Sequence, residues 1–197
     1  VGGLGSRYNY ESRNLTSSST LRYANTWDDV HNFDILGGFE VEDRNLLSVI
    51  ATAKQYSTDK LPELGNGQPD NAYSNVYASG ILSYLASANY NYDNKYYLSA
   101  SARRDGSSRL GADNRWANFW SVSGAWRIIE EDFMKPTSKW LTDLKLRASY
   151  GVNGTLPSDL YGYMGLTSLS GGYMENPALI QSQIENRDLE WETNYNL

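Results

Sequence analysis

The side chains able to carry out catalysis or hold a metal are few and scattered in this sequence. The chain has no cysteine and a single histidine, His31, so a thiolate site is excluded and a histidine metal site or a Ser-His triad is disfavoured. Glu130, Glu131 and Asp132 form an acidic run, which a solvated turn explains better than an acid pair. We therefore expect no enzyme activity, no catalytic residue, no metal and no cofactor.

Two sets of polar residues are candidates for contact with a ligand or partner. Asp105 and Arg109 bracket the run Asp-Gly-Ser-Ser-Arg, which could touch a substrate or a partner. The favoured alternative is a tight turn capped by Asp and Ser, with Arg109 paired to a carboxylate. Tyrosines in or beside long connections could stack on sugars or contact peptides, or simply pack loops together: Tyr73, Tyr77, Tyr161, Tyr163 and Tyr173.

The overall composition narrows the class of protein. The net charge of -6 argues against a nucleic-acid partner, which usually meets a basic surface. No run of 18 apolar residues is present, so no transmembrane helix is expected. The 16 Tyr and 6 Trp greatly outnumber the 4 Phe. Amphipathic aromatics in this excess suit a membrane interface, although a soluble carbohydrate-binding β-sandwich would also explain them.

Alternation of apolar and polar residues predicts an all-β, antiparallel protein. The predicted strands are residues 20–27, 33–41, 81–92, 96–103, 120–127 and 144–153, with a seventh starting near Trp191. Most are close to the roughly 9–11 residues that a tilted strand needs to cross a bilayer. Connections predicted as long (1–19, 55–77, 105–115, 154–188) alternate with shorter ones (28–30, 93–94, 129–142), which is typical of outer-membrane barrels.

The phase of the charged residues indicates which face would be inside a barrel. An Arg or Lys on the lipid face costs about 2–4 kcal/mol at the bilayer midplane, so the polar face is predicted to line the lumen: Asp34, Glu40, Arg103, Arg127, Lys145 and Arg147. Aromatics near the strand ends are predicted to form lipid-facing girdles: Trp27, Tyr90, Tyr92, Tyr96, Trp120 and Trp126. Alternation alone also fits a soluble sheet with one wet face; the connection lengths favour the barrel.

Three stretches of the sequence resemble one protein family. Residues 103–134 (RRDGSSRLGADNRWANFWSVSGAWRIIEEDFM) look like a signature stretch of the SusC/RagA TonB-linked outer-membrane transporters. Residues 140–154 (WLTDLKLRASYGVNG) resemble the strand that follows, and residues 176–193 resemble a later segment with an N-x-x-L-x-W-E-T pattern. The resemblance covers about residues 20–197.

The resemblance implies a function that the residues alone do not. The family has a 22-stranded barrel with a plugged lumen, so residues 1–197 would all belong to the barrel domain, as about six to seven strands, with the plug and the TonB-interacting segment elsewhere. The implied role is import of oligosaccharides or peptides across the Gram-negative outer membrane. The implied partners are membrane lipid, a SusD-like lipoprotein and TonB. A passive porin or adhesin barrel and a soluble β-sandwich carbohydrate-binding module are the alternatives.

Overall fold

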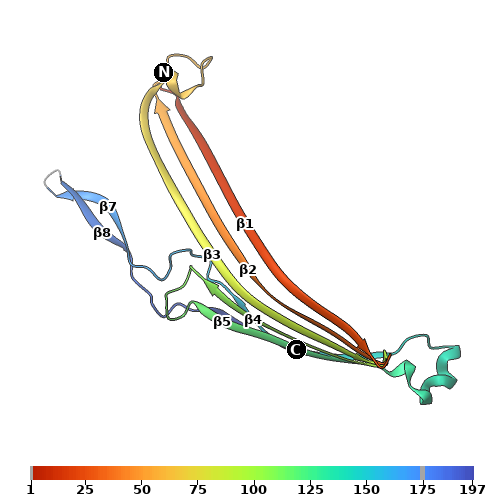
Figure 1. The fold of residues 1–197 in the computed structure, drawn as a ribbon. Helices are drawn as coiled ribbons and strands as arrows, with labels where there is room; N and C mark the ends of the chain where they lie inside the picture. The colour runs from red at the N-terminus through yellow and green to blue at the C-terminus, as the bar shows by residue number, and fades with distance from the viewer. Residues whose placement is uncertain (1, 174–175) are drawn as a thin grey trace. The chain divides into compact units, whose positions relative to one another are not determined.

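The computed structural model describes residues 2–173 and 176–197, and strands dominate it (Figure 1). Seven strands form one sheet in the order β1-β2-β3-β4-β5-β6-β9. Their bounds are β1 Leu4–Trp27, β2 His31–Lys54, β3 Gln68–Tyr92, β4 Tyr96–Ser107, β5 Trp116–Arg127, β6 Lys145–Thr155 and β9 Glu192–Asn196. The strands β7 (Leu166–Tyr173) and β8 (Asn176–Gln183) pair as a separate hairpin. Short 3-10 helices lie at η1 (Leu64–Asn66), η2 (Ile128–Glu130) and η3 (Asp132–Lys139).

The first three strands contribute to two compact units. The smaller unit contains the chain up to Leu15 together with residues 42–80. The larger unit contains residues 16–41 and 81–197. It therefore holds the turn-proximal parts of β1, β2 and β3 and all of the later strands.

Antiparallel pairing in the larger unit fixes which side chains share a face. Tyr92 lies opposite Tyr96, which lies opposite Trp126, and Trp126 lies opposite Leu146. Directly opposed residues point to the same side of a sheet, and successive residues point to opposite sides. These four residues therefore lie on the same face of the sheet, and the same alternation defines that face in β3, β4, β5 and β6.

Tight turns connect the strands at one end of the larger unit. Asp28 and Asp29 between β1 and β2, and Asp93 and Asn94 between β3 and β4, all have φ between 48° and 56°. Asp and Asn tolerate this left-handed region better than other non-glycine residues, and tight hairpin turns that match the right-handed twist of the strands need it. The Asp93 amide also donates to the carbonyl of Val30 at 2.8 Å, which joins the two turns.

In the smaller unit, one tyrosine packs the ends of the strands together. Tyr56 is buried, and its ring lies against Gly3, Gly5 and Gly67. A Cβ built on Gly5 would lie 2.3 Å from the Tyr56 hydroxyl oxygen, so glycine is needed there for the close approach. The Gln55 amide donates to the Gly3 carbonyl at 3.0 Å, which keeps β1 and β2 paired up to this point.

The strands are longer than the sequence pattern predicted. β1 has 24 residues and β3 has 25, so parts of the predicted loops 1–19 and 55–77 are strand. Apolar/polar alternation arises only where one face meets an apolar medium. A strand that is polar on both faces still pairs through its backbone, and the pattern does not reveal it. The hairpin β7–β8, inside the predicted loop 154–188, was likewise missed.

The lengths of the connections differ from the prediction. The connection between β5 and β6 holds the two 3-10 helices η2 and η3. β4 extends to Ser107 and β5 begins at Trp116, so their connection is shorter than the one between β5 and β6. The alternation of long and short connections is therefore less strict than predicted. Among the described residues, no helix is long and apolar enough to cross a membrane.

Candidate functional site

The apolar face of the larger unit is uncovered. Leu98 is 53% exposed and Tyr84 is 51% exposed, and the same face exposes other large apolar side chains: Phe33, Ile35, Phe39, Tyr92, Tyr96, Trp120, Val122, Leu146, Tyr150 and Tyr195. The buried apolar side chains among the described residues are Ala53, Tyr56 and Leu110. A water-soluble sandwich would cover such a face with a second sheet. The predicted β-sandwich alternative is therefore disfavoured by the exposure of this face.

An aromatic row crosses the apolar face at the end where the tight turns lie. Ring centroids are 6.3 Å apart for Trp27 and His31, 5.0 Å for His31 and Tyr92, 6.2 Å for Tyr92 and Tyr96, and 6.4 Å for Tyr96 and Trp126. The row therefore runs from β1 to β5. Four of the six predicted girdle residues belong to it, and Tyr90 joins through its hydroxyl, 2.8 Å from His31 Nδ1. Trp120 packs elsewhere, edge-to-face against Tyr150.

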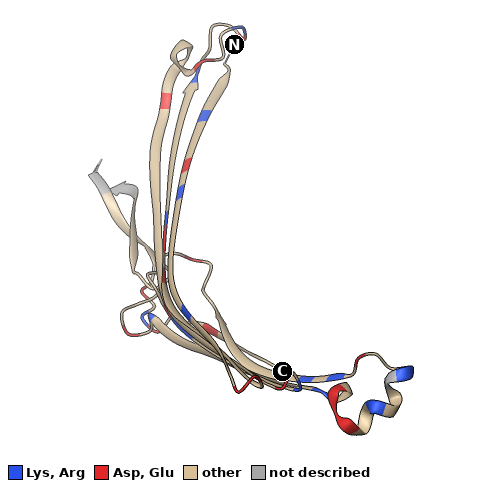
Figure 2. Ribbon diagram, turned by 45° about the vertical axis from the view of Figure 1, so that its right-hand side comes forward, with Lys and Arg blue, Asp and Glu red and all other residues tan. Residues whose placement is uncertain are grey.

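The acidic turn between β5 and β6 is tied to this aromatic row. Glu131 Oε1 accepts hydrogen bonds from the Tyr96 hydroxyl at 2.5 Å and from Trp126 Nε1 at 3.0 Å. These two hydrogen bonds, in that order, lower the pKa of Glu131. Figure 2 shows the charges gathered on this connection. Each of the three acids has a partner, because Glu130 pairs with Arg127 and Asp132 pairs with Lys135. The described residues contain no cluster suited to a metal ion.

The six residues predicted to line a lumen share the polar face. In β4 to β6, Arg103 lies opposite Phe119, Arg127 opposite Lys145, and Ala125 opposite Arg147, all in one phase. Arg22 pairs with Asp34, and Glu40 reaches Arg103 at 3.2 Å. The structure thus brings them to one side of the sheet; that this side is a lumen remains a proposal.

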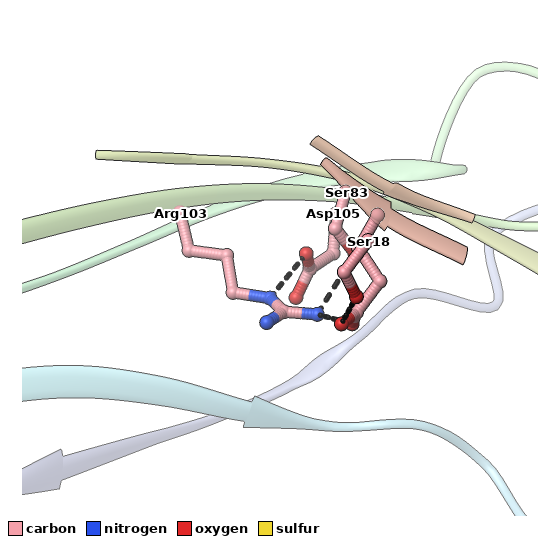
Figure 3. A network of polar contacts seen from close by, with 5 residues as sticks. Ser18, Ser83, Arg103 and Asp105 are labelled. Carbon is pink, nitrogen blue, oxygen red and sulfur yellow. Dashed lines mark hydrogen bonds and ion pairs between the residues drawn. The ribbon is translucent and has the colours of Figure 1, made fainter. Parts of the chain in front are cut away.

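Arg103 is the centre of a polar network on this face (Figure 3). Its Nε donates to Asp105 at 2.7 Å, and its Nη2 donates to Ser83 Oγ at 2.9 Å and to Glu40 at 3.2 Å. Ser18 donates to the second oxygen of Glu40 at 2.7 Å. The network joins β1, β2, β3 and β4. Because Ser83 and Asp105 are only 1% and 8% exposed, the contacts of Arg103 with these two residues are partly shielded from water, whereas the contacts of Glu40 are exposed.

The three other cations among the predicted lumen-lining residues are less well paired. Arg127 contacts Glu130 at 2.9 Å and Asp143 at 3.9 Å. Lys145 lies over the ring of Tyr97, 4.3 Å from its centroid. Arg147 is exposed and forms no ion pair among the residues that the structure describes. Among the six residues predicted to line the lumen, ion pairs are therefore formed by Asp34, Glu40, Arg103 and Arg127.

Recesses occur along the polar face. Shallow hollows of the larger unit are lined by polar-face side chains of several neighbouring strands, including Asp34 and Asn89 in one, and Arg103, Ser121 and Ser149 in another. A third hollow lies beside Arg147.

The Asp105–Arg109 run is a structural junction. Asp105 belongs to β4 and not to a loop, and its carboxylate is occupied by Arg103. Ser107 and Leu110 are both 0% exposed. The prediction that Arg109 pairs with a carboxylate was wrong, because Nη1 donates to the carbonyl of Pro157 at 3.3 Å. The run anchors the 156–165 segment to the end of β4, and Asp105 is buried too deeply to meet a ligand.

The five candidate tyrosines fall into three groups. Tyr73 and Tyr77 are exposed but lie in β3 of the smaller unit, not in a loop, because β3 begins earlier than its alternation suggested. Tyr161 and Tyr163 are half-buried in the predicted loop, where their carbonyls accept bonds from the side chain of Gln183 and the amide of Asn186. The side chain of Tyr173 lies outside the described residues.

Comparison with known proteins supplies the family. No protein-family model matches the chain. A TonB-dependent receptor of Formosa agariphila is 31% identical over 208 residues, covering 99% of this chain and 20% of that receptor. The TonB-dependent receptor SusC of Bacteroides thetaiotaomicron is 34% identical over 119 residues, covering 57% of this chain and 12% of SusC. The chain belongs with the SusC-type TonB-dependent receptors. It spans about a fifth of the length of the full-length relatives it matches.

Solved structures of this receptor type share the fold. The RagAB peptide transporter superposes with a TM-score of 0.86 at 31% identity, covering 98% of this chain and 22% of that one. The "open-open" state of the RagAB peptide importer superposes with a TM-score of 0.82, covering 96% of this chain and 21% of the other. The all-β, antiparallel sheet of this SusC-type chain thus matches a piece of a TonB-dependent barrel.

Sequence reasoning missed two residues of the apolar face. His31 was considered only for a metal site or a Ser-His triad, but it links Trp27 to Tyr92 in the aromatic row. Arg104 was not assigned to any face, although strict alternation from Arg103 places it on the apolar one. The even-numbered phase of β4 could have revealed it.

Proposed function

We propose that the chain is part of the β-barrel wall of an outer-membrane transporter, and that all 197 residues belong to the barrel domain. The observation that carries the proposal is the sheet of the larger unit, with an uncovered apolar face on one side and a charged, polar face on the other. Lipid can solvate the first and water the second. The role of the segment is then to hold a water-filled path across the membrane, not to catalyse a reaction.

We propose that the whole receptor imports oligosaccharides or peptides. The relatives are receptors and transporters, and two of the solved structures are of a peptide importer. A SusD-like lipoprotein would cover the loops at the cell surface, and TonB would act through parts of the receptor beyond this segment. Uptake of labelled peptide and labelled oligosaccharide by cells with and without the receptor tests the substrate class. If cells without the receptor took up both substrates as well as cells with it, import of these substrates would be contradicted.

Single cysteines test which face meets lipid. The segment has no cysteine of its own, so Leu98→Cys and Ser99→Cys place one fluorophore on each side of β4 at nearly the same depth. In the full-length receptor, a lipid-borne nitroxide should quench the probe at Leu98 strongly and the probe at Ser99 weakly. Equal quenching at both positions would exclude a barrel wall. Recovery of the isolated segment as a soluble, cooperatively melting monomer would instead favour the β-sandwich.

A further inference from the structure

Two adjacent arginines of β4 lie in opposite environments. Successive side chains of a strand point to opposite faces, and Arg103 is on the polar face with Asp105 and Glu40. Arg104 is therefore on the apolar face. The register confirms this phase, since Arg104 lies directly opposite Tyr84 on β3 and Asn118 on β5.

The guanidinium of Arg104 lies beside aromatic rings. Its guanidinium carbon lies 5.3 Å from the centroid of the Trp116 ring, and Trp116 stacks on Tyr84 at 6.1 Å. Arg104 is exposed, and it forms no ion pair with any residue in the described parts of the chain. Stacking on Trp holds the guanidinium in place while its five N–H donors stay available. We call Tyr84, Arg104, Trp116 and Asn118 the rim site.

The position of Arg104 along β4 places the rim site at the edge of the apolar band. On this face, β4 runs from Tyr96 through Leu98, Ala100 and Ala102 to Arg104. Eight residues of strand span about 27 Å, and a tilt of roughly 40° reduces this to about 20 Å across the membrane. The apolar band of such barrels is about 25 Å tall. Arg104 therefore lies near the boundary opposite the turn-side aromatic row, where lipid headgroups begin.

We propose that the rim site binds the phosphate of an anionic lipid in the leaflet next to the long connections. This inference rests on the proposed function, because it needs the apolar face to meet lipid. The guanidinium can donate two parallel hydrogen bonds to phosphate oxygens, a geometry that a point charge cannot match. Asn118 adds an amide donor beside it, and the Tyr84 and Trp116 rings lie where acyl chains meet the headgroups.

The test uses the full-length receptor in lipid nanodiscs, with phosphatidylglycerol as the anionic probe and phosphatidylcholine as its neutral counterpart. Native mass spectrometry during a titration gives the apparent affinity for retained phosphatidylglycerol. Arg104→Gln should weaken it about fivefold, since one cation near an anionic surface contributes roughly 1 kcal/mol. Arg104→Lys should retain only part of the affinity, because it keeps the charge but loses the two parallel hydrogen bonds and the stacking on Trp116. Arg147→Gln, which removes an unpaired arginine from the other face, should leave it unchanged.

Three results would overturn the proposal. The first is an unchanged affinity in Arg104→Gln, and the second is an equal loss in Arg147→Gln. The third is that inorganic phosphate displaces the lipid at the site and is retained as well in detergent, which would assign a soluble anion instead. Heat-modifiable migration of each variant reports whether the barrel is folded in the bilayer. A folded receptor with unchanged lipid affinity refutes the rim site alone, whereas a receptor that never inserts refutes the barrel wall.

Discussion

An arginine introduced at either of two adjacent positions of β4 should lower the free energy of unfolding by different amounts on the two faces. Ala100 lies on the apolar face midway between Tyr96 and Arg104, and the next residue, Ser101, lies on the polar face. Ala100→Arg places a cation near the bilayer midplane, at a cost of about 2–4 kcal/mol. Ser101→Arg loses the 2.7 Å hydrogen bond between Ser101 Oγ and Ser121 Oγ, which contributes about 1 kcal/mol. The new cation of this variant lies on the polar face, in contact with water.

The measurement is urea unfolding of the full-length receptor in phospholipid vesicles, followed by heat-modifiable migration. Ala100→Arg should unfold at clearly lower urea than Ser101→Arg, by a difference of about 1–3 kcal/mol. The neighbouring pair Ala148→Arg and Ser149→Arg on β6 has the same phase and controls for local clashes inside the barrel. Equal losses in both pairs, or a larger loss on the serine side, would refute the assignment of the faces.

Three further changes have defined outcomes. Arg103→Met strands the buried Asp105 carboxylate and should destabilise the receptor by about 1–3 kcal/mol, with partial recovery in the double variant with Asp105→Asn; no recovery would contradict the network. Gly106→Ala places a Cβ 2.8 Å from the Trp116 ring and should cost about 1–3 kcal/mol, measured by urea midpoint. The pKa of Glu131 is lowered in the folded state, so its stabilisation is complete at neutral pH and fades as the pH falls through that lowered value. When melting temperatures are measured over a series of pH values, Glu131→Gln should lack this loss of stability at low pH. A pH profile identical to that of the unmodified receptor would exclude the stabilising role of Glu131.

The sequence predicted best where the two faces meet different media. Residues 81–92 and 96–103 alternate because one side is apolar and the other wet, and the structure pairs them in that phase. The outer parts of β1 and β3 carry charges or polar groups on both sides, so the pattern offered no period to detect. For such stretches, strand formation depends on backbone pairing with distant segments.

Partners within the polar face were harder to predict than the face itself. Phase alone places Arg103 and Glu40 on one side, but their 3.2 Å contact depends on the register of β1 to β4, which joins residues 63 positions apart. The same limit explains Arg109, for which a carboxylate was expected. Its actual acceptor, the Pro157 carbonyl, belongs to a connection whose path the sequence does not specify.

The uncovered apolar face has a consequence for how the sequence can diverge. A side chain in a packed core has fixed neighbours, so removing a methylene group leaves a void and costs stability. Ala86, Ala102 and Val122 lie on the apolar face of the larger unit, where, under the proposed function, fluid acyl chains would refill any space. Replacements among Ala, Val and Leu there should be nearly neutral. Natural sequences can therefore differ on this face in the size of each side chain, while each position stays apolar.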